Sequence, residues 1–589
     1  MKPKDNFLWM AAGIGLLMGG IGIYLCLVGM VEVFSKRDVI QDVVTLGMFL
    51  LIANWALAGY VAALRASSVP SAKRPVANLL SGLVAGLVTS LILALLVIIG
   101  SKINLREVFI TASPTLYNIL TFGRGIQGLW VLIGVGALFG LAGAGLFLLP
   151  GRLRRPVMVG ILVTFFMALF AGLFSVIMVN QGGIILRSSE WLFGQTGLTL
   201  PGALGLFSAT FLITLLWSAR GTQVRARYAD LPKRPKFALL VASFAALVYV
   251  ALMLPQVSGP FVAQVIVLVA LYALAGLGLN ITLGFAGLLD LGFVAFFAIG
   301  AYTVGLLTSY GQYGLVHISF WVAAPIAVLV AFIAGAFLGL PVLGVRGDYL
   351  AIATLGFGEI VRILAGSDWL SPWLGGPQGI IGIQKPCLGW LGPFIKVDVP
   401  RVCHGFELGG PVKIYYLAVV SAVLIAIIAW RLRDSRLGRS WMAIREDEDV
   451  AEALGVYLIQ NKILAYSLGA AFAGLGGAIF AVLIGSIFAS SMQLIVSINV
   501  VALIIVGGMG SIPGVILGAI VLIGLPELLR EVSEYRFLFY GVILIAMMRF
   551  KPEGLWPSQT AKRELHREDD AASPVEKAEA PVETAEAEA

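Results

Sequence analysis

The first 230 residues alternate between long apolar runs and short polar connections. Six apolar runs lie near residues 7–31, 43–64, 77–100, 127–149, 156–179 and 199–217. Each is close to the roughly 20 residues that an α-helix needs to cross a bilayer. The first run is too long for the core of a signal peptide and no small-residue cleavage site follows it. The pattern therefore predicts six transmembrane helices, the first of them retained.

The remainder of the chain continues the pattern with shorter and more interrupted runs. Ten of them lie near residues 237–254, 261–283, 292–309, 320–343, 351–364, 413–430, 463–485, 495–507, 514–529 and 537–549. Glycine interrupts several, so the count of ten holds to about two either way. We expect an all-α integral membrane protein, a polytopic helical bundle of about 14–16 transmembrane segments that includes discontinuous helices.

Polar segments divide the chain into three parts. Residues 220–236 (RGTQVRARYADLPKRPK) form the most polar linker of the first half. Residues 558–589 contain nine acidic and four basic residues among many Ala, Pro and Glu, a composition that cannot bury enough surface to fold. We expect an N-terminal membrane extension over 1–236, a membrane core over 237–557 and a disordered cytoplasmic tail over 558–589.

Composition excludes several classes of protein. Hydrophobic residues make up 59% of the 589 positions and charged residues only 12%, whereas soluble domains carry about 25% charged residues. A soluble enzyme or a nucleic-acid-binding protein is therefore excluded. With three cysteines and three histidines, the chain can build neither a disulfide framework nor an intramembrane histidine metal site. We expect no metal ion.

The formal charge of +8 lies in short Lys and Arg clusters between apolar runs. With the N-terminus inside, the inner loops of the first half carry 14 Lys and Arg residues and the outer loops carry 6. Positive residues favour the cytoplasmic side. This bias predicts cytoplasmic N- and C-termini, an external loop over 365–412 and a cytoplasmic loop over 431–462.

Two cysteines fall in the predicted external loop. Cys387 and Cys403 are separated by fifteen residues, a loop that a disulfide could close with a gain of about 3 kcal/mol. Two unrelated thiols are the equal alternative, and a reducing compartment would require them.

Ionisable residues within apolar stretches are candidates for function because they are costly there. Asp290 lies in NITLGFAGLLDLG, and Glu359 and Arg362 lie three residues apart in the segment 347–364. The second pair shares one helical face and could neutralise itself as a structural ion pair. Each of the three could also line a substrate pathway, and the sequence leaves both alternatives open.

Glycine clusters interrupt the same helical runs. Gly284, Gly287 and Gly292 flank Asp290, and a second cluster surrounds Pro513. Its members are Gly507, Gly508, Gly510 and Gly514. Such clusters favour discontinuous helices whose exposed N–H groups could face an anionic group such as a carboxylate. Close packing between helices is the alternative explanation.

The segment 440–455 (SWMAIREDEDVAEALG) has the pattern of a short amphipathic helix. Trp441, Ile444, Ala451 and Leu454 recur at helical spacing, five carboxylates occupy much of the remainder, and Gly455 stands as a helix stop. A helix of this kind below the bilayer suits docking into a groove on another protein. A solvated surface helix without a partner is the alternative.

Several of these segments together resemble one family. IREDE at 444–448, GDYLAIATLGFGEIVRIL at 347–364 and GGPQGIIGIQKP at 375–386 are similar to segments of the permease subunits of branched-chain amino acid ABC importers, in particular the larger, M-type subunit. GLLDLGFVAFFAIGAY at 287–302, GGMGSIPG at 507–514 and RFKPEGL at 549–555 follow the same pattern. The matches extend over about residues 239–557.

The resemblance implies a function and a set of partners. It implies a second homologous permease, two cytoplasmic ATPases, an extracytoplasmic binding protein and a bacterial plasma (inner) membrane, with no nucleic acid. Segment 440–455 would be the coupling helix, with the ATPase contacts drawn from Arg445, Glu446, Glu448, Glu452 and Gly455. Asp290, Gly287, Gly292, Glu359 and Arg362 would be candidates for the substrate pathway.

The chain itself is not expected to be an enzyme. It contains no Gly-x4-Gly-Lys-Ser/Thr phosphate loop, so ATP and Mg²⁺ would be bound by the partner ATPases and the chain would need no cofactor. Closure of the ATPases would move the docked helix and expose the pathway to alternate sides. A permease for urea or short amides and an ion-coupled secondary carrier are the alternative functions.

Overall fold

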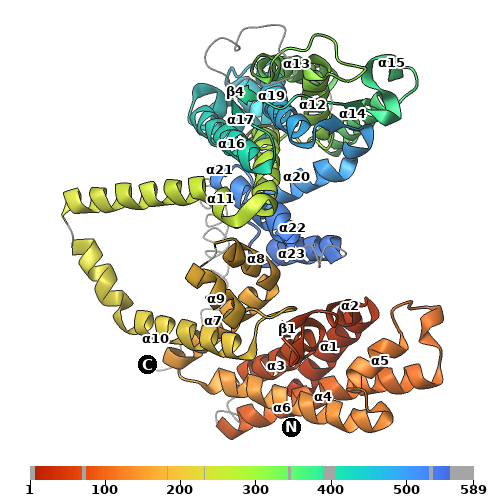
Figure 1. Ribbon diagram of the computed structural model, residues 1–589, viewed down its shortest axis with the longest axis vertical. Helices are drawn as coiled ribbons and strands as arrows, with labels where there is room; N and C mark the ends of the chain where they lie inside the picture. The colour runs from red at the N-terminus through yellow and green to blue at the C-terminus, as the bar shows by residue number, and fades with distance from the viewer. Residues whose placement is uncertain are drawn as a thin grey trace, which may run out of the picture. The chain divides into compact units, whose positions relative to one another are not determined.

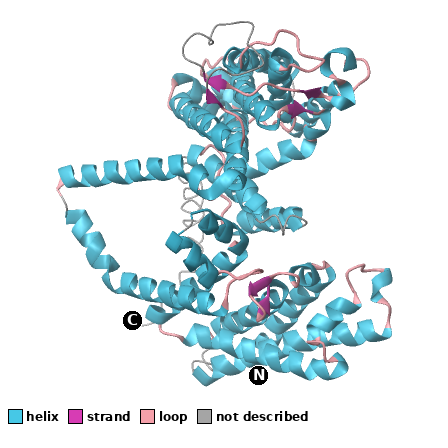
Figure 2. Ribbon diagram, viewed as in Figure 1, coloured by secondary structure: helices cyan, strands magenta, loops and turns pink. Residues whose placement is uncertain are grey.

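Helices predominate in the computed structural model, which describes residues 7–68, 75–181, 183–230, 232–342, 347–388, 406–528 and 535–557 (Figure 2). The chain divides into two units, Met1–Leu247 and Val248–Ala589, and the boundary falls within the long helix α11 (Lys233–Leu279).

Four long helices form the centre of the first unit. α1 (Phe7–Leu27), α3 (Leu46–Ala66), α4 (Pro75–Lys102) and α6 (Gly128–Leu148) lie side by side (Figure 1). Glycine permits the close crossings, because a Cβ added at Gly59 of α3 would overlap the carbonyl oxygen of Gly140 in α6. Asn54 of α3 is buried and donates a hydrogen bond to the Met18 carbonyl of α1 over 3.0 Å.

Further elements connect and extend these four helices. They are α2 (Met30–Phe34), β1 (Asp38–Ile40), β2 (Val44–Thr45), η3 (Leu105–Glu107), α5 (Pro114–Leu120), η4 (Gly125–Gln127), α7 (Gly151–Leu169), α8 (Ala171–Gln181), α9 (Gly183–Leu192) and α10 (Leu200–Asp230). β1 and β2 pair antiparallel. α7 packs on α10, and α7 and α8 are bent by 69° at their junction.

The second unit is built around α19 (Leu458–Ile484). This helix packs against α12 (Val294–Thr308) and α13 (Phe320–Val342), and the three lie together in Figure 1. Small residues again permit close crossings, since a Cβ added at Gly300 of α12 would overlap the Gly474 carbonyl oxygen of α19. The core of the unit therefore forms where helices from three separate parts of the sequence meet.

The other elements of the second unit surround this centre. In chain order they are η5 (Asn280–Phe285), α14 (Asp348–Ala365), α15 (Ser371–Leu374), η6 (Gly376–Gln378), β3 (Ile380–Ile381), β4 (Cys387–Leu388), β5 (Phe406–Glu407), α16 (Pro411–Arg433), α17 (Arg436–Glu446), α18 (Glu448–Ala453), β6 (Ser486–Ile487), η7 (Ala489–Ser491), α20 (Leu494–Gly507), α21 (Ile512–Ala519), η8 (Ile520–Gly524), α22 (Leu525–Leu528) and α23 (Arg536–Phe550).

The two loops expected on opposite sides of the membrane lie at opposite ends of α19. α17 and α18 directly precede its first residue. At its other end β6 pairs antiparallel with β3, which lies in the 365–412 segment. α19 has 27 residues and is therefore about 40 Å long, enough to separate the two loops by a bilayer.

The prediction of an all-α, polytopic membrane protein with discontinuous helices is confirmed. In the described part of the chain, ten helices are long and apolar enough to cross a membrane, or eleven if the bent α7–α8 pair is one span. The other predicted runs lie in shorter apolar helices or merge. The run at 237–254 lies in α11, and the run at 261–283 continues from α11 into η5. α11 kinks at Gly259 (φ 84°) beside Pro255 and Pro260.

Candidate functional site

The second unit contains a broken helix at the glycines that flank Asp290. α11 passes into the π-helix η5, and helix resumes only with α12 at Val294. Gly287 adopts a left-handed conformation (φ 72°) that residues with a Cβ rarely adopt. A Cβ at Gly292 would overlap the Thr354 carbonyl oxygen of α14, so the break is packed tightly on a neighbouring helix.

Asp290 is fully buried inside this break. Its Oδ1 accepts a hydrogen bond from the Gly292 amide over 2.9 Å, and Thr354, whose hydroxyl donates to the Ala351 carbonyl of its own helix over 3.1 Å, lies beside the same side chain. Among the described residues, neither its Oδ2 nor the nearby Tyr466 hydroxyl of α19 has a hydrogen-bond partner. Buried polar atoms are usually paired, so the break retains spare hydrogen-bonding capacity.

α17 is held against the start of α19. Ser435 caps its N-terminus by accepting a hydrogen bond from the Gly438 amide over 3.3 Å. Trp441 is fully buried, and its indole N–H donates to the Asn461 carbonyl over 2.8 Å. Ile444 is also buried. The face predicted from Trp441 and Ile444 is therefore the face that packs inward.

The segment predicted as one helix over 440–455 consists of two. Asp447 has an extended backbone and caps α18, because its Oδ1 accepts hydrogen bonds from the amides of Asp449 and Val450. The interruption changes the helical register. Ala451 is buried but Leu454 is 79% exposed, so the four apolar residues at helical spacing do not share one buried face.

The predicted helix stop at Gly455 is confirmed. α18 ends at Ala453, and Gly455 takes a left-handed conformation with φ 87°. The Val456 amide donates to the Ala451 carbonyl, and the Gly455 amide donates to the Glu452 carbonyl. This pair of hydrogen bonds is a Schellman motif, which favours glycine because only glycine takes this conformation without strain.

The acidic residues of this segment fall into two groups. Glu448 forms an ion pair with Lys462 of α19, and the two side chains are only 16% and 8% exposed. Glu446, Asp447, Asp449 and Glu452 are exposed. Around them lie three exposed apolar side chains, Val450, Leu454 and Tyr457. We refer to these seven exposed residues as the acidic face.

Arg445 lies beside the acidic face and contacts the helix break. Its guanidinium donates a hydrogen bond to the Gly284 carbonyl of η5 over 2.8 Å. A Cβ added at Gly287 would stand 3.0 Å from the Arg445 Cγ. The sequence suggested Arg445 for docking but contained no signal for this contact, because 161 residues separate its two partners.

α19 connects the two parts of the site along one of its faces. Lys462, Tyr466 and Gly469 follow each other at intervals of four and three residues, so they lie on one side of the helix. Lys462 pairs with Glu448 of α18, Tyr466 lies near Asp290, and Gly469 packs against the Gly278 carbonyl of α11. The acidic helices and the helix break therefore share one rigid support.

The second glycine cluster also interrupts a helix, but its N–H groups face inward. α20 ends at Gly507, and Gly508 and Gly510 have φ of 118° and 75°. The Gly510 amide donates over 2.9 Å to Oδ1 of Asn280, a buried residue of η5. The Gly510 amide therefore already has a hydrogen-bond partner in Asn280, whereas the sequence pattern suggested an anionic group as its partner.

The remaining candidate residues lie elsewhere in the second unit. Glu359 and Arg362 form an ion pair on α14, with 2.7 Å between Oε2 and Nε, so the two charges neutralise each other. Cys387 is disulfide-bonded, and Cys403 lies outside the described residues. No group of three or more His, Cys, Asp and Glu in the described segments could hold a metal ion.

Comparison with known proteins identifies the family to which this site belongs. Residues 261–548 match the family model described as "Branched-chain amino acid transport system / permease component". The chain is 40% identical over 322 residues to the high-affinity branched-chain amino acid transport system permease protein LivM of Escherichia coli (strain K12). That match covers 52% of this chain and 74% of LivM. The chain belongs to this permease family.

Two other relatives are less similar to the chain. The probable branched-chain amino acid transport permease protein LivM of Methanocaldococcus jannaschii is 22% identical over 51% of this chain and 94% of its own length. The autoinducer 2 import system permease protein LsrC of Yersinia pseudotuberculosis serotype O:3 is 27% identical over 42% of this chain and 65% of its own length. No solved structure matches the chain.

The residues that match the family model all lie in the second unit. The matched residues include the helix break, Arg445, the Glu448–Lys462 ion pair and the acidic face. The resemblance to the M-type permease subunit is confirmed by the LivM relatives. The first 260 residues, with α1 to α10, lie outside the family model.

Proposed function

We propose that this chain is the transmembrane permease subunit of an ATP-driven importer for branched-chain, hydrophobic amino acids. It would work in a bacterial inner membrane with both termini in the cytoplasm. Its partners would be a second homologous permease, two ATPases and an extracytoplasmic binding protein. The observation that carries the proposal is the hydrogen bond from Arg445 to Gly284, which connects the acidic loop to the broken helix.

The acidic face would be the contact with an ATPase. It combines four exposed acidic residues with exposed apolar side chains on a short helix pair, and apolar anchors within a charged rim are typical of protein interfaces. A bilayer surface is an unsuitable partner because it is itself negative. Glu452 belongs to this face, whereas Glu448 would serve to fix α18 to α19 through Lys462.

The broken helix would be the part that moves. Residues 287–293 belong to no helix, while the neighbouring α14, α17 and α18 are regular helices. Displacement of α17 by ATPase closure would act on Gly284 through the Arg445 guanidinium. Because Asp290 and Phe293 follow within ten residues, that displacement would rearrange the pathway and expose it to alternate sides.

ATP would be bound only by the partner subunits, because the sequence contains no phosphate-binding loop. The chain would need no cofactor of its own. The energy for transport would therefore reach this chain as a movement, which the hydrogen bond from Arg445 to Gly284 transmits.

The test is ATP-dependent leucine uptake by the complete complex in proteoliposomes, with wild-type chain, Arg445→Ala and Arg439→Ala. Arg439 is the matched control, because it lies on the same helix but hydrogen-bonds the nearby Asp434 carbonyl. We expect Arg445→Ala to lower uptake at least tenfold while ATP hydrolysis continues, and Arg439→Ala to retain uptake.

Other outcomes would contradict the proposal. Unchanged coupling in Arg445→Ala would reject the mechanical role of this residue. Uptake by the purified chain without ATPases would favour a secondary carrier, and ATP-dependent uptake of urea without leucine would favour the amide permease.

A further inference from the structure

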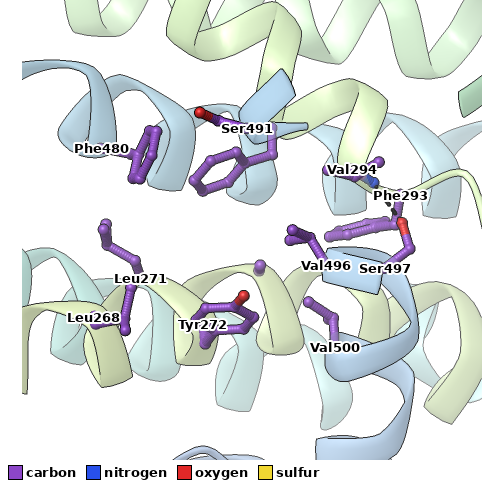
Figure 3. Close-up of a pocket in the computed structure, with 12 residues that line it drawn as sticks. Leu268, Leu271, Tyr272, Phe293, Val294, Phe480, Ser491, Val496, Ser497 and Val500 are labelled. Carbon is purple, nitrogen blue, oxygen red and sulfur yellow. Dashed lines mark hydrogen bonds between the residues drawn. The ribbon is translucent and has the colours of Figure 1, made fainter. Parts of the chain in front are cut away.

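A partly open apolar cavity lies beside the helix break in the second unit. Its volume is about 110 Å³, and four elements besides the short η7 contribute to its wall: α11, α12, α19 and α20. Figure 3 shows side chains from these elements converging on it, among them Phe293, Phe480, Val496 and Val500.

The lining suits an aliphatic group. Phe297 of α12 and Phe480 of α19 meet with ring centroids 5.4 Å apart and form one wall. Polar atoms are few and include the hydroxyls of Ser491 and Ser497. Small-molecule sites commonly combine an apolar lining with a few polar groups. An engineered apolar cavity of about 150 Å³ holds benzene, so a cavity of this size suits a smaller, branched aliphatic group.

The cavity wall is attached directly to the segment that Arg445 contacts. Phe293 and Val294 line the cavity and are the first residues after the break. The Val294 amide donates to the Ser497 hydroxyl over 2.9 Å, which joins the start of α12 to α20 at the cavity wall (Figure 3). A displacement of the break would therefore change the shape of this cavity.

One side of the cavity is accessible. Ser491 is exposed and lies seven residues beyond the end of α19 that is remote from the acidic helices. The cavity thus lies between that accessible residue and the helix break. A group entering past Ser491 would meet the apolar wall before it met Asp290, which is fully buried.

We propose that this cavity is the subsite for the aliphatic side chain of the transported amino acid. The inference rests on the proposed function, because it assigns a place to the side chain of that substrate. The subsite adds a size limit within the membrane path to whatever selection a binding protein exerts. A lipid acyl chain is the competing occupant of the same chemistry.

The first test narrows the cavity with Val500→Phe and compares uptake of leucine and valine by the complete complex. Ile498→Phe is the matched control, because it adds the same ring on the same helix at a residue that is 45% exposed. An apolar pocket can discriminate about tenfold or more between two substrates that differ by one methylene group. We expect the leucine-to-valine uptake ratio to fall about tenfold in Val500→Phe and to stay unchanged in Ile498→Phe.

The outcomes separate the subsite from the proposed function. An unchanged leucine-to-valine ratio in Val500→Phe, with both uptakes reduced equally or not at all, would overturn the subsite. Failure of the wild-type complex to take up leucine at all would instead overturn the proposed function.

A second test does not depend on the larger side chain folding correctly. Ser491→Cys in the complete complex is labelled with an apolar maleimide, and the unmodified chain reports background labelling from Cys26, which is buried. We expect leucine, delivered by the binding protein with ATP, to slow labelling at least threefold, and glycine to leave it unchanged. Equal labelling rates with and without leucine would overturn the subsite. A labelling rate that depends on the lipid content and not on leucine would also overturn it.

Discussion

Both units of this protein use glycine for close helix crossings, and the second unit also uses it at the breaks beside Asp290 and Pro513. In the first unit, glycines such as Gly59 and Gly140 lie inside regular helices and allow two backbones to touch. In the second unit, Gly287 and Gly508 have positive φ and stand where a helix is interrupted. The first use joins rigid helices, and the second creates a place at which a helix can change direction.

Buried charge follows the same division. The central helices α1, α3, α4 and α6 bury Asn, Ser and Thr, but none of the charged residues described there is buried. The second unit buries Asp290 and Lys462 close to its broken helix. Charged groups within a membrane protein are costly and are retained where they act, so the comparison places function in the second unit.

The largest effect is expected from the buried ion pair of the second unit. Glu448→Ala removes the carboxylate beside Lys462, and loss of one partner of a buried pair costs about 3–5 kcal/mol. We expect a clear decrease in thermal stability of the purified chain. Glu452→Ala removes an exposed carboxylate from the same helix and should change stability by less than about 0.5 kcal/mol.

A further variant distinguishes the charge from the packing at this pair. Replacement of both partners, with Glu448→Gln and Lys462→Met, leaves no buried charge behind and should recover much of the stability. Equal stability of Glu448→Ala and Glu452→Ala would show that the ion pair contributes little, and the contrast between the units would lose its energetic basis.

The next effect tests helix contact in the first unit. Gly59→Ala places a Cβ on the Gly140 carbonyl oxygen, so α3 and α6 must separate, at a cost of about 1–3 kcal/mol. Gly134→Ala is the matched control, because a Cβ there meets nothing within 4 Å. We expect lower thermal stability in Gly59→Ala only. Comparable stability of the two variants would mean that close contact does not hold these helices together.

Gly287→Ala tests the other use of glycine. Its left-handed conformation costs a residue with a Cβ about 1–2 kcal/mol, and the new methyl would also approach Arg445. We expect leucine uptake by the complete complex to fall severalfold. Gly356→Ala on α14, where a Cβ meets nothing within 4 Å, should keep uptake. Normal uptake in Gly287→Ala would show that the break tolerates a different backbone.

Local sequence pattern predicted the helices well and their interruptions in part. The apolar run at 77–100 corresponds to α4 and the run at 463–485 to α19, because twenty apolar residues have few alternatives to a membrane helix. The register change at Asp447 was missed, since a continuous helical pattern concealed an aspartate that caps the second helix.

The contacts of the site were not predictable in the same way. Arg445 and Gly284 are 161 residues apart. Lys462 lies at the edge of an apolar run, and no local sequence pattern indicates Glu448 as its partner. Asp290 could be selected because a lone carboxylate between apolar runs is conspicuous. Its neighbours Thr354 and Tyr466 could not, because each lies on another helix far along the sequence and no local pattern marks its hydroxyl.

The smallest effect concerns one hydroxyl beside the break. The Thr354 Oγ1 accepts a hydrogen bond from the Leu291 amide over 3.0 Å and contacts Asp290, so Thr354→Val removes both contacts without a change in shape. A hydrogen bond of this kind contributes about 1 kcal/mol. We expect a small loss of thermal stability together with a decrease in leucine uptake, because the segment 286–293 loses a fixed point.

Thr303→Val is the matched control, since the Thr303 hydroxyl only donates to the Ile299 carbonyl of its own helix. If both variants behave alike, the side chains packed around the break do not position it, and the difference between the units lies in the backbone alone.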